Sequence, residues 1–265
     1  RYEGESFGAP YELPNDQCYC ETCAAIGSVQ WNWRMLLTTG EARYADLIET
    51  TLYNGFLSGV ALDGRNFFYI NPLLSRGGYG REEWYTVACC PPNIMRTIAA
   101  VEHHIATHDT AGIQIHLYNA ATLHAEPESD KTIRLKMETD YPWAGTVRLT
   151  VEESISTGWT LSLRVPGWAG EASVQVNGAV ADTACVPGSY VSLQREWQAG
   201  DVVELELTMQ PTLIESHPQV DPNRGSVAIQ RGPVIYCLEQ HDHQANILTV
   251  QIDAKAPLTA AWNAE

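Results

Sequence analysis

The hydrophobic pattern of this chain changes its period once, near residue 110, and this change limits the possible folds more than any other feature. Before it, apolar residues recur every three or four positions in three segments, 21–38, 41–58 and 92–108. Such spacing places apolar side chains on one face of a helix. The sequence therefore predicts three or four helices in the first part of the chain.

The boundaries of these helices carry their own signals. Asn15 and Asp16, after Pro14, are typical of a helix start, and Gly40 is typical of a helix end. Pro92 marks the start of the third segment. The stretch 60–91 is rich in loop residues, and within it residues 67–72 are expected to be extended.

After Asp109 apolar and polar residues alternate, as in Leu161, Leu163 and Val165. Short alternating runs separated by Gly, Pro and Asn favour an antiparallel β-sandwich, and Asn177-Gly178 predicts a hairpin turn. We therefore expect an α+β chain with two parts. Residues 1–109 would be helical, and residues 110–265 would form a β-sandwich region, either complete or incomplete at its C-terminus.

Charge and hydropathy exclude some partners. The chain has 16 basic and 32 acidic residues, and its net charge of −16 disfavours nucleic acid. No apolar stretch approaches the roughly 20 residues of a membrane helix, so we expect no membrane partner. The chain has no starting Met and begins at once with dense motif, so we expect a fragment of a longer protein. The missing signal peptide therefore says little about compartment, and the location that we expect is cytoplasmic.

Five of the seven cysteines lie in the first 90 residues, namely Cys18, Cys20, Cys23, Cys89 and Cys90. An odd count and this clustering disfavour a disulfide framework and favour a metal or catalysis. Glu21 adds a carboxylate ligand, and zinc takes four sulfur, nitrogen or oxygen ligands. Buried cysteines that serve only as small apolar residues are the alternative.

Glu21 and Cys23 are two positions apart, and such residues face roughly opposite ways on a regular helix. They can therefore bind one metal ion only where a helix begins. The C-x-x-C of Cys20 and Cys23 is a moderate metal signal by itself, and the adjacent pair Cys89-Cys90 does not complete a zinc ribbon.

Several other side chains are candidates for chemistry. A glycosidase needs a pair of carboxylates, and the first 21 residues hold five acids among which the sequence does not choose: Glu3, Glu5, Glu12, Asp16 and Glu21. Glu49 follows two apolar residues and could face inward, in which case its carboxylate must be paired or functional. The alternative is an exposed residue on the helix surface. Tyr69 could contact a sugar or belong to the core. His103, His104 and His108 are expected in one helix, at its surface or in the core.

Several motifs together resemble the family-127 glycoside hydrolases, the β-L-arabinofuranosidases. They cover roughly residues 4–96, and the later part of the chain matches mainly in character. The motifs are Gly4-Glu5-Ser6-Phe7-Gly8, Tyr11-Glu12-Leu13-Pro14-Asn15-Asp16, Glu21-Thr22-Cys23-Ala24, Leu52-Tyr53-Asn54-Gly55, Phe68-Tyr69-Ile70-Asn71-Pro72-Leu73 and Ala88-Cys89-Cys90-Pro91-Pro92-Asn93.

The resemblance implies a fold and a site. Residues 1–109 would be the C-terminal portion of an (α/α)6 catalytic barrel. Zinc would be held by Glu21, Cys23, Cys89 and Cys90, and Glu49 and Tyr69 would contact the substrate. Cys89 would be the nucleophile of a retaining hydrolase that releases β-L-arabinofuranosyl units, and Glu5 would be the acid/base. The partner would be an arabinose-containing oligosaccharide or glycoconjugate, and a homodimer is possible.

The sequence also departs from the family pattern. Cys18 and Cys20 add thiols that could compete for metal or be oxidised, and three or four helices do not make a twelve-helix barrel. Three alternatives stay open: a structural zinc module with a carbohydrate-binding sandwich and no catalysis, a Cys–His hydrolase, and a redox-active thiol cluster.

Overall fold

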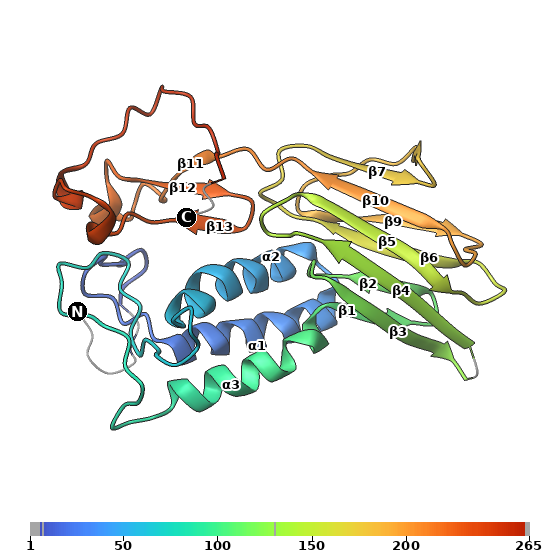
Figure 1. Ribbon diagram of the computed structural model, residues 1–265, viewed down its shortest axis with the longest axis horizontal. Coiled ribbons are helices and arrows are strands. Elements are labelled where there is room, and N and C mark those ends of the chain that lie inside the picture. The colour runs from blue at the N-terminus through green and yellow to red at the C-terminus, as the bar shows by residue number, and fades with distance from the viewer. Residues whose placement is uncertain (1–5, 7, 130, 263–265) are drawn as a thin grey trace.

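The computed structural model describes residue 6 and residues 8–129 and 131–262 (Figure 1). The helical part comes first and contains α1 (Thr22–Thr39), α2 (Ala42–Thr51) and α3 (Cys90–Ala100). Shorter helical turns follow these helices or lie near the C-terminus: η1 (Leu52–Phe56), η2 (Leu57–Gly59), η3 (Val101–His104), η4 (Asp221–Asn223), η5 (Gln240–Asp242) and η6 (Ile247–Thr249).

The three α-helices pack side by side around a small apolar core (Figure 1). Ile26, Val29 and Leu36 of α1 meet Ile48 of α2 and Ile94 of α3, as the helical spacing predicts. Gly40 ends α1 with a φ of 70°, and its N–H donates to the Leu36 carbonyl oxygen at 2.8 Å. The predicted stop signal is confirmed, and α2 then runs back along α1.

The start of α1 differs from the prediction. Its N-cap is Glu21, and neither Asn15 nor Asp16 caps it. The Asn15 amide instead donates to the Pro222 carbonyl oxygen at 3.1 Å, and Asp16 accepts from Arg76 at 3.4 Å. Tertiary contacts therefore occupy both side chains.

The second predicted segment, 41–58, is helical, but its helix type changes along the segment. After Thr51 the chain passes from α2 into η1, a π-helical turn, and then into η2. The third predicted segment, 92–108, was too long. After η3 the chain enters strand β1 (Ala106–Asp109), which pairs with β2 (Gly112–Ile115). His108 therefore lies in a strand, because strand pairing at residues 106–109 overrides the helical periodicity. His104 and His108 do not share a helix face.

The β-rich part contains three sheets. Their strand orders are β1-β2-β6-β9, β3-β4-β5-β10-β7-β8 and β11-β12-β13. The remaining strands are β3 (Ala121–Glu128), β4 (Lys131–Thr139), β5 (Thr146–Glu153), β6 (Trp159–Val165), β7 (Ala172–Val176), β8 (Ala179–Val180), β9 (Ser189–Arg195), β10 (Val202–Leu207), β11 (Thr212–Glu215), β12 (Val227–Arg231) and β13 (Val234–Tyr236).

The first two sheets share one hydrophobic core, and we call them the two-sheet unit. Alternate residues of β6 on one side and of β4 on the other are buried in it, including Leu161, Leu163, Ile133 and Leu135. Most strand pairs are antiparallel, as expected. The pair β2–β6 is parallel, which the period-2 pattern does not distinguish.

The third sheet lies over α2 and η1 (Figure 1). Asn54 of η1 fixes it in place. The Asn54 amide donates to the Pro233 carbonyl oxygen at 2.8 Å, and its oxygen accepts from the Ile235 N–H at 2.8 Å. The widened π turn thus presents a side chain that pairs with the edge of β13 as a backbone would.

The structure shows a mixed helix and sheet fold. Among the described residues it contains three α-helices, so it does not show the (α/α)6 barrel that the resemblance implies. None of the helices in the described part is long and apolar enough to cross a membrane.

Candidate metal centre and active site

Glu21 and Cys23 lie on either side of the start of α1. Glu21 has extended backbone angles, φ −73° and ψ 138°, and forms an antiparallel bridge with Ile70. Around it the Thr22 N–H donates to the Tyr69 carbonyl oxygen at 3.0 Å, and the Asn71 N–H donates to that of Cys20 at 2.8 Å. Glu21 therefore stands outside the helix while Cys23 is in its first turn, which removes the geometric objection to a shared metal.

Cys89 and Cys90 lie at the start of α3. Cys89 is the N-cap and Cys90 is the first helical residue. The following Pro91 and Pro92 suit this position, because the first turn of a helix needs no intrahelical N–H donors. Two helix starts thus bring together the four predicted ligands.

The ligand atoms of these four residues all lie within 4.8 Å of one another. Cys23 Sγ is 3.5 Å from Cys90 Sγ, and Cys89 Sγ is 3.7 Å from Cys90 Sγ. Glu21 Oε1 is 3.3 Å from Cys89 Sγ and 3.8 Å from Cys90 Sγ. In a tetrahedral zinc site with sulfur at ~2.3 Å, neighbouring ligands are about 3.8 Å apart. The residues therefore fit a tetrahedral metal ion.

The electrostatics also favour a cation at this place. Burial raises the pKa of Cys23 and of Cys90, so both are thiols at neutral pH unless a positive charge stabilises the thiolates. The N-termini of α1 and α3 both meet at the cluster, and helix N-termini stabilise negative charge. A cluster of one carboxylate and three thiolates is compatible with this environment once a divalent cation is bound.

Tyr69 faces the cluster and is held by two further tyrosines. The Tyr19 hydroxyl donates to the Tyr69 hydroxyl at 3.2 Å, and the Tyr85 hydroxyl accepts from the Tyr69 N–H at 3.0 Å. The hydrogen bond with Tyr19, burial and the hydrogen bond with Cys89 together raise the pKa of Tyr69. The structure therefore brings Tyr69 to Cys89.

Sequence reasoning did not select Tyr19. Residues alternate in direction along an extended segment, so Tyr19 and Glu21 share a face two positions apart. A prediction of extended structure before α1 would therefore have identified Tyr19 as a residue on the same face as Glu21.

Three family models match consecutive parts of the chain. The β-L-arabinofuranosidase GH127 catalytic domain matches residues 1–103, the GH127 middle domain matches residues 112–209, and the glycoside hydrolase family 127 C-terminal domain matches residues 211–262.

The chain belongs to glycoside hydrolase family 127.

Relatives of known function and structure support this membership. A non-reducing end β-L-arabinofuranosidase of Bifidobacterium longum subsp. longum is 34% identical over 261 residues, which is 92% of this chain and 39% of that protein. A GH127 β-L-arabinofuranosidase structure from Geobacillus stearothermophilus T6 has a TM-score of 0.84 at 41% identity, covering 89% of this chain and 39% of that one.

A further solved structure, described as a glycoside hydrolase, has a TM-score of 0.85 at 42% identity, over 90% of this chain and 41% of that one. The family-127 chain thus spans about two fifths of the length of these relatives.

Of the two remaining predicted site residues of this family-127 chain, Glu5 lies outside the described residues and Glu49 lies apart from the cluster. Glu49 is 1% exposed, and its carboxylate accepts hydrogen bonds from Tyr141 at 2.5 Å, from Trp168 at 3.0 Å and from Arg164. The structure does not bring Glu49 to the cysteine cluster, because these three partners hold it against the two-sheet unit. A contact between Glu49 and substrate stays a prediction.

The histidines of the family-127 chain that were weighed as ligands are also remote from the cluster. His104 is buried and its ring packs on Trp33 with centroids 4.8 Å apart, while His103 and His108 are exposed. Among the described residues, no histidine hydrogen bonds to Cys89, so this part of the chain offers no support for a Cys–His hydrolase.

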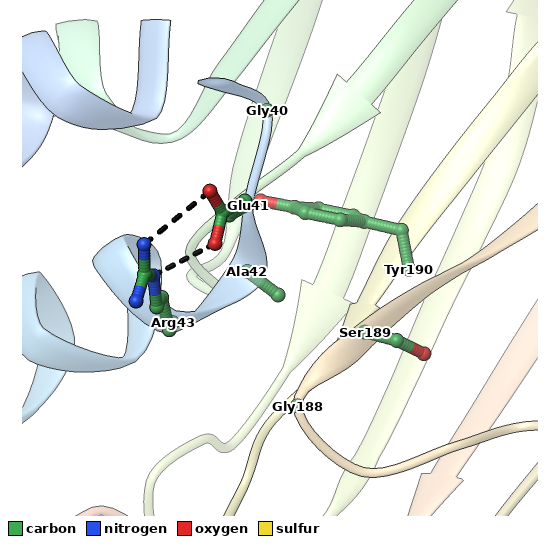
Figure 2. A pocket seen from close by; sticks show the side chains of 7 residues that line it. All are labelled: Gly40, Glu41, Ala42, Arg43, Gly188, Ser189 and Tyr190. Carbon is green, nitrogen blue, oxygen red and sulfur yellow. Dashed lines mark hydrogen bonds and ion pairs between the residues drawn. The ribbon is translucent and has the colours of Figure 1, made fainter. Parts of the chain in front are cut away.

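A shallow surface pocket lies at the other end of α1 (Figure 2). The two charged residues of its lining form an ion pair with each other, since Arg43 Nε is 2.7 Å from Glu41 Oε2. We assign this pocket no role in the family-127 chain. Its lining residues are Gly40, Glu41, Ala42, Arg43, Gly188, Ser189 and Tyr190.

Proposed function

We propose that the protein containing this chain is a retaining glycosidase that releases β-L-arabinofuranosyl units, with Cys89 as its nucleophile. The observation that carries the proposal is the meeting of Glu21, Cys23, Cys89 and Cys90 at two helix starts beside Tyr69. The family membership and the printed activity of the relatives support the substrate class, an arabinose-containing carbohydrate.

Zinc is the proposed metal. Three thiols and one carboxylate are a donor set that zinc accepts, and the spacing of their atoms fits a tetrahedron. Bound zinc would supply the positive charge that keeps the cysteines deprotonated at neutral pH. Glu21, Cys23 and Cys90 would hold it together with Cys89.

Burial separates the roles of the cysteines. Cys90 is 0% exposed, so a sugar cannot reach its sulfur. Cys23 is half-buried and makes hydrogen bonds with Asn93 and Cys90. Cys89 is half-buried, sits at the helix N-cap and contacts Tyr69, so its sulfur is the one best placed to meet an anomeric carbon.

The proposed reaction has two displacements. Cys89 Sγ forms a bond with the anomeric carbon as the glycosidic bond breaks, and Glu5 gives its proton to the departing oxygen. Water then displaces the sulfur while Glu5 takes the water proton. Two inversions at one carbon give net retention of configuration.

The rest of the proposed architecture concerns the longer protein. Residues 1–109 would be the C-terminal portion of an (α/α)6 barrel, and residues 110–265 a β-sandwich region. Large apolar side chains on the described helices are exposed, with Trp31 at 66% and Met95 at 56%, and further barrel helices would cover such faces. The relatives, which are more than twice as long, supply the length for those helices.

The test is an assay of the full-length protein on an aryl β-L-arabinofuranoside. We expect hydrolysis with retention, loss of activity to background after a chelator removes the metal, and recovery when zinc is added. Bound zinc without hydrolysis would instead favour a structural zinc module. Hydrolysis that survives complete metal removal would contradict the role of the metal.

A further inference from the structure

Cys18 and Cys20 form a thiol pair of their own beside the metal cluster. Their sulfur atoms are 3.1 Å apart, the shortest separation between two cysteine sulfurs in the described part of the chain. Both residues are half-buried. The four-residue metal cluster includes neither of them.

Side chains alternate in direction along the extended segment before α1, which explains why the thiol pair is separate from the metal cluster. Tyr19 and Glu21 direct their side chains to Tyr69 and Cys89, while the sulfurs of Cys18 and Cys20 contact each other. The backbone of the segment is fixed, because the Cys20 carbonyl oxygen accepts from the Asn71 N–H at 2.8 Å. The pair is therefore held together on the face that does not bind the metal.

We propose that Cys18 and Cys20 form a redox-active dithiol that a low-molecular-weight disulfide, such as oxidised glutathione, converts to an intramolecular disulfide. A disulfide requires a sulfur separation of about 2.0 Å, so closure moves the two atoms by only about 1 Å relative to each other. This proposal is independent of the glycosidase activity and of the four metal ligands.

The exchange takes two steps. The two thiols lie in one chain of hydrogen bonds, because Cys20 donates to Cys18 Sγ and Cys18 donates to the Asn15 carbonyl oxygen at 3.6 Å. One thiol of the pair attacks the small disulfide, breaks its S–S bond and releases one small thiol, which takes up the proton lost by the attacking cysteine. The other thiol of the pair then attacks the sulfur of the modified cysteine and expels the second small thiol, which takes up the remaining proton. The two cysteines lose two electrons, and the small disulfide is reduced to two thiols.

Mass spectrometry of a proteolytic fragment can detect the disulfide between Cys18 and Cys20 directly. Cleavage after glutamate releases residues 13–21, a fragment that contains Cys18 and Cys20 but not Cys23. The zinc-loaded protein is equilibrated in glutathione buffers of increasing oxidation, its free thiols are alkylated, and the fragment is weighed by mass spectrometry. We expect the fragment to escape alkylation and to become two hydrogen atoms lighter, with no change in zinc content.

Single substitutions test the pairing of the two thiols. C20S and C18S are each expected to accumulate a glutathione adduct on the cysteine that remains, because the second thiol that would expel the glutathione is missing. C185S is the matched control, since Cys185 is a half-buried cysteine that belongs to neither cluster, and the disulfide should form in it as in the unmodified protein.

Three results would overturn the proposal. The fragment could stay doubly alkylated in a buffer that modifies the exposed Cys237, which shows that the oxidant was active. Cys18 or Cys20 could instead be found bonded to Cys23. Zinc could leave as the disulfide forms, which would show that the pair is part of the metal site.

Discussion

Replacing Cys89 with Ser in the full-length enzyme is expected to lower kcat on an aryl β-L-arabinofuranoside by a factor on the order of 10³ or more. A serine hydroxyl is a far weaker nucleophile than a thiolate and has no neighbouring base here among the described histidines. Cys89 is also the half-buried sulfur that contacts Tyr69. Initial rates measured at saturating substrate and with added zinc check this expectation.

C90S is the matched control for this change. Cys90 is an adjacent proposed ligand, but its side chain is fully buried. Its loss should weaken metal binding, so that part of the activity returns as the zinc concentration is raised. The activity of C89S should not return at any zinc concentration. Substantial turnover by C89S, or identical zinc titrations of the two variants, would contradict Cys89 as nucleophile.

Replacing Arg164 with Met is expected to lower the free energy of unfolding by about 3–5 kcal/mol. Arg164 is 0% exposed, and its guanidinium pairs with Asp46 and Glu49 of α2. Its Nε also donates to the His116 carbonyl oxygen at 2.6 Å. Removing the cation leaves the carboxylate of Glu49 buried without its counter-charge, between α2 and the two-sheet unit. Urea unfolding followed by tryptophan fluorescence measures the change.

R148M controls for the loss of an arginine in the same unit. The Arg148 side chain is 48% exposed and lies 3.3 Å from Glu204 in a surface ion pair. Such pairs contribute about 0–1 kcal/mol, so R148M should unfold nearly as the unmodified protein does. If R164M and R148M lose similar stability, Arg164 does not join the helices to the sheets as the contacts indicate.

The metal cluster shows how far the sequence predicts the site. Clustered cysteines and the helix-start argument for Glu21 and Cys23 rest on local spacing, and the structure places both residues at the start of α1. The signal for that start was nevertheless wrong, because Asn15 and Asp16 make tertiary contacts. The family resemblance implied that these two residues share a metal ion with Cys89 and Cys90. Local spacing alone does not predict that two helix starts far apart in the sequence meet in space.

Glu49 shows where local pattern fails. Its position after two apolar residues suggested an inward carboxylate that must be paired or functional. Its partner Arg164 lies 115 positions away, on a strand where alternation with Leu163 and Val165 places polar residues away from the core. The packing of α2 on β6 also buries the side of the strand that carries Arg164. Local hydrophobic periodicity does not predict such a tertiary contact. The same holds for η1, which turns to meet β13.

X-ray absorption at the zinc edge of the purified protein tests the central claim most directly. With Glu21, Cys23, Cys89 and Cys90 as ligands, we predict one zinc ion per chain, bound by three sulfur atoms at about 2.3 Å and by oxygen at about 2.0–2.2 Å. C90S should reduce the sulfur count by one, and C18S should leave it unchanged. A protein that binds no zinc, or a zinc ion that loses a sulfur ligand in C18S, would contradict the site described here.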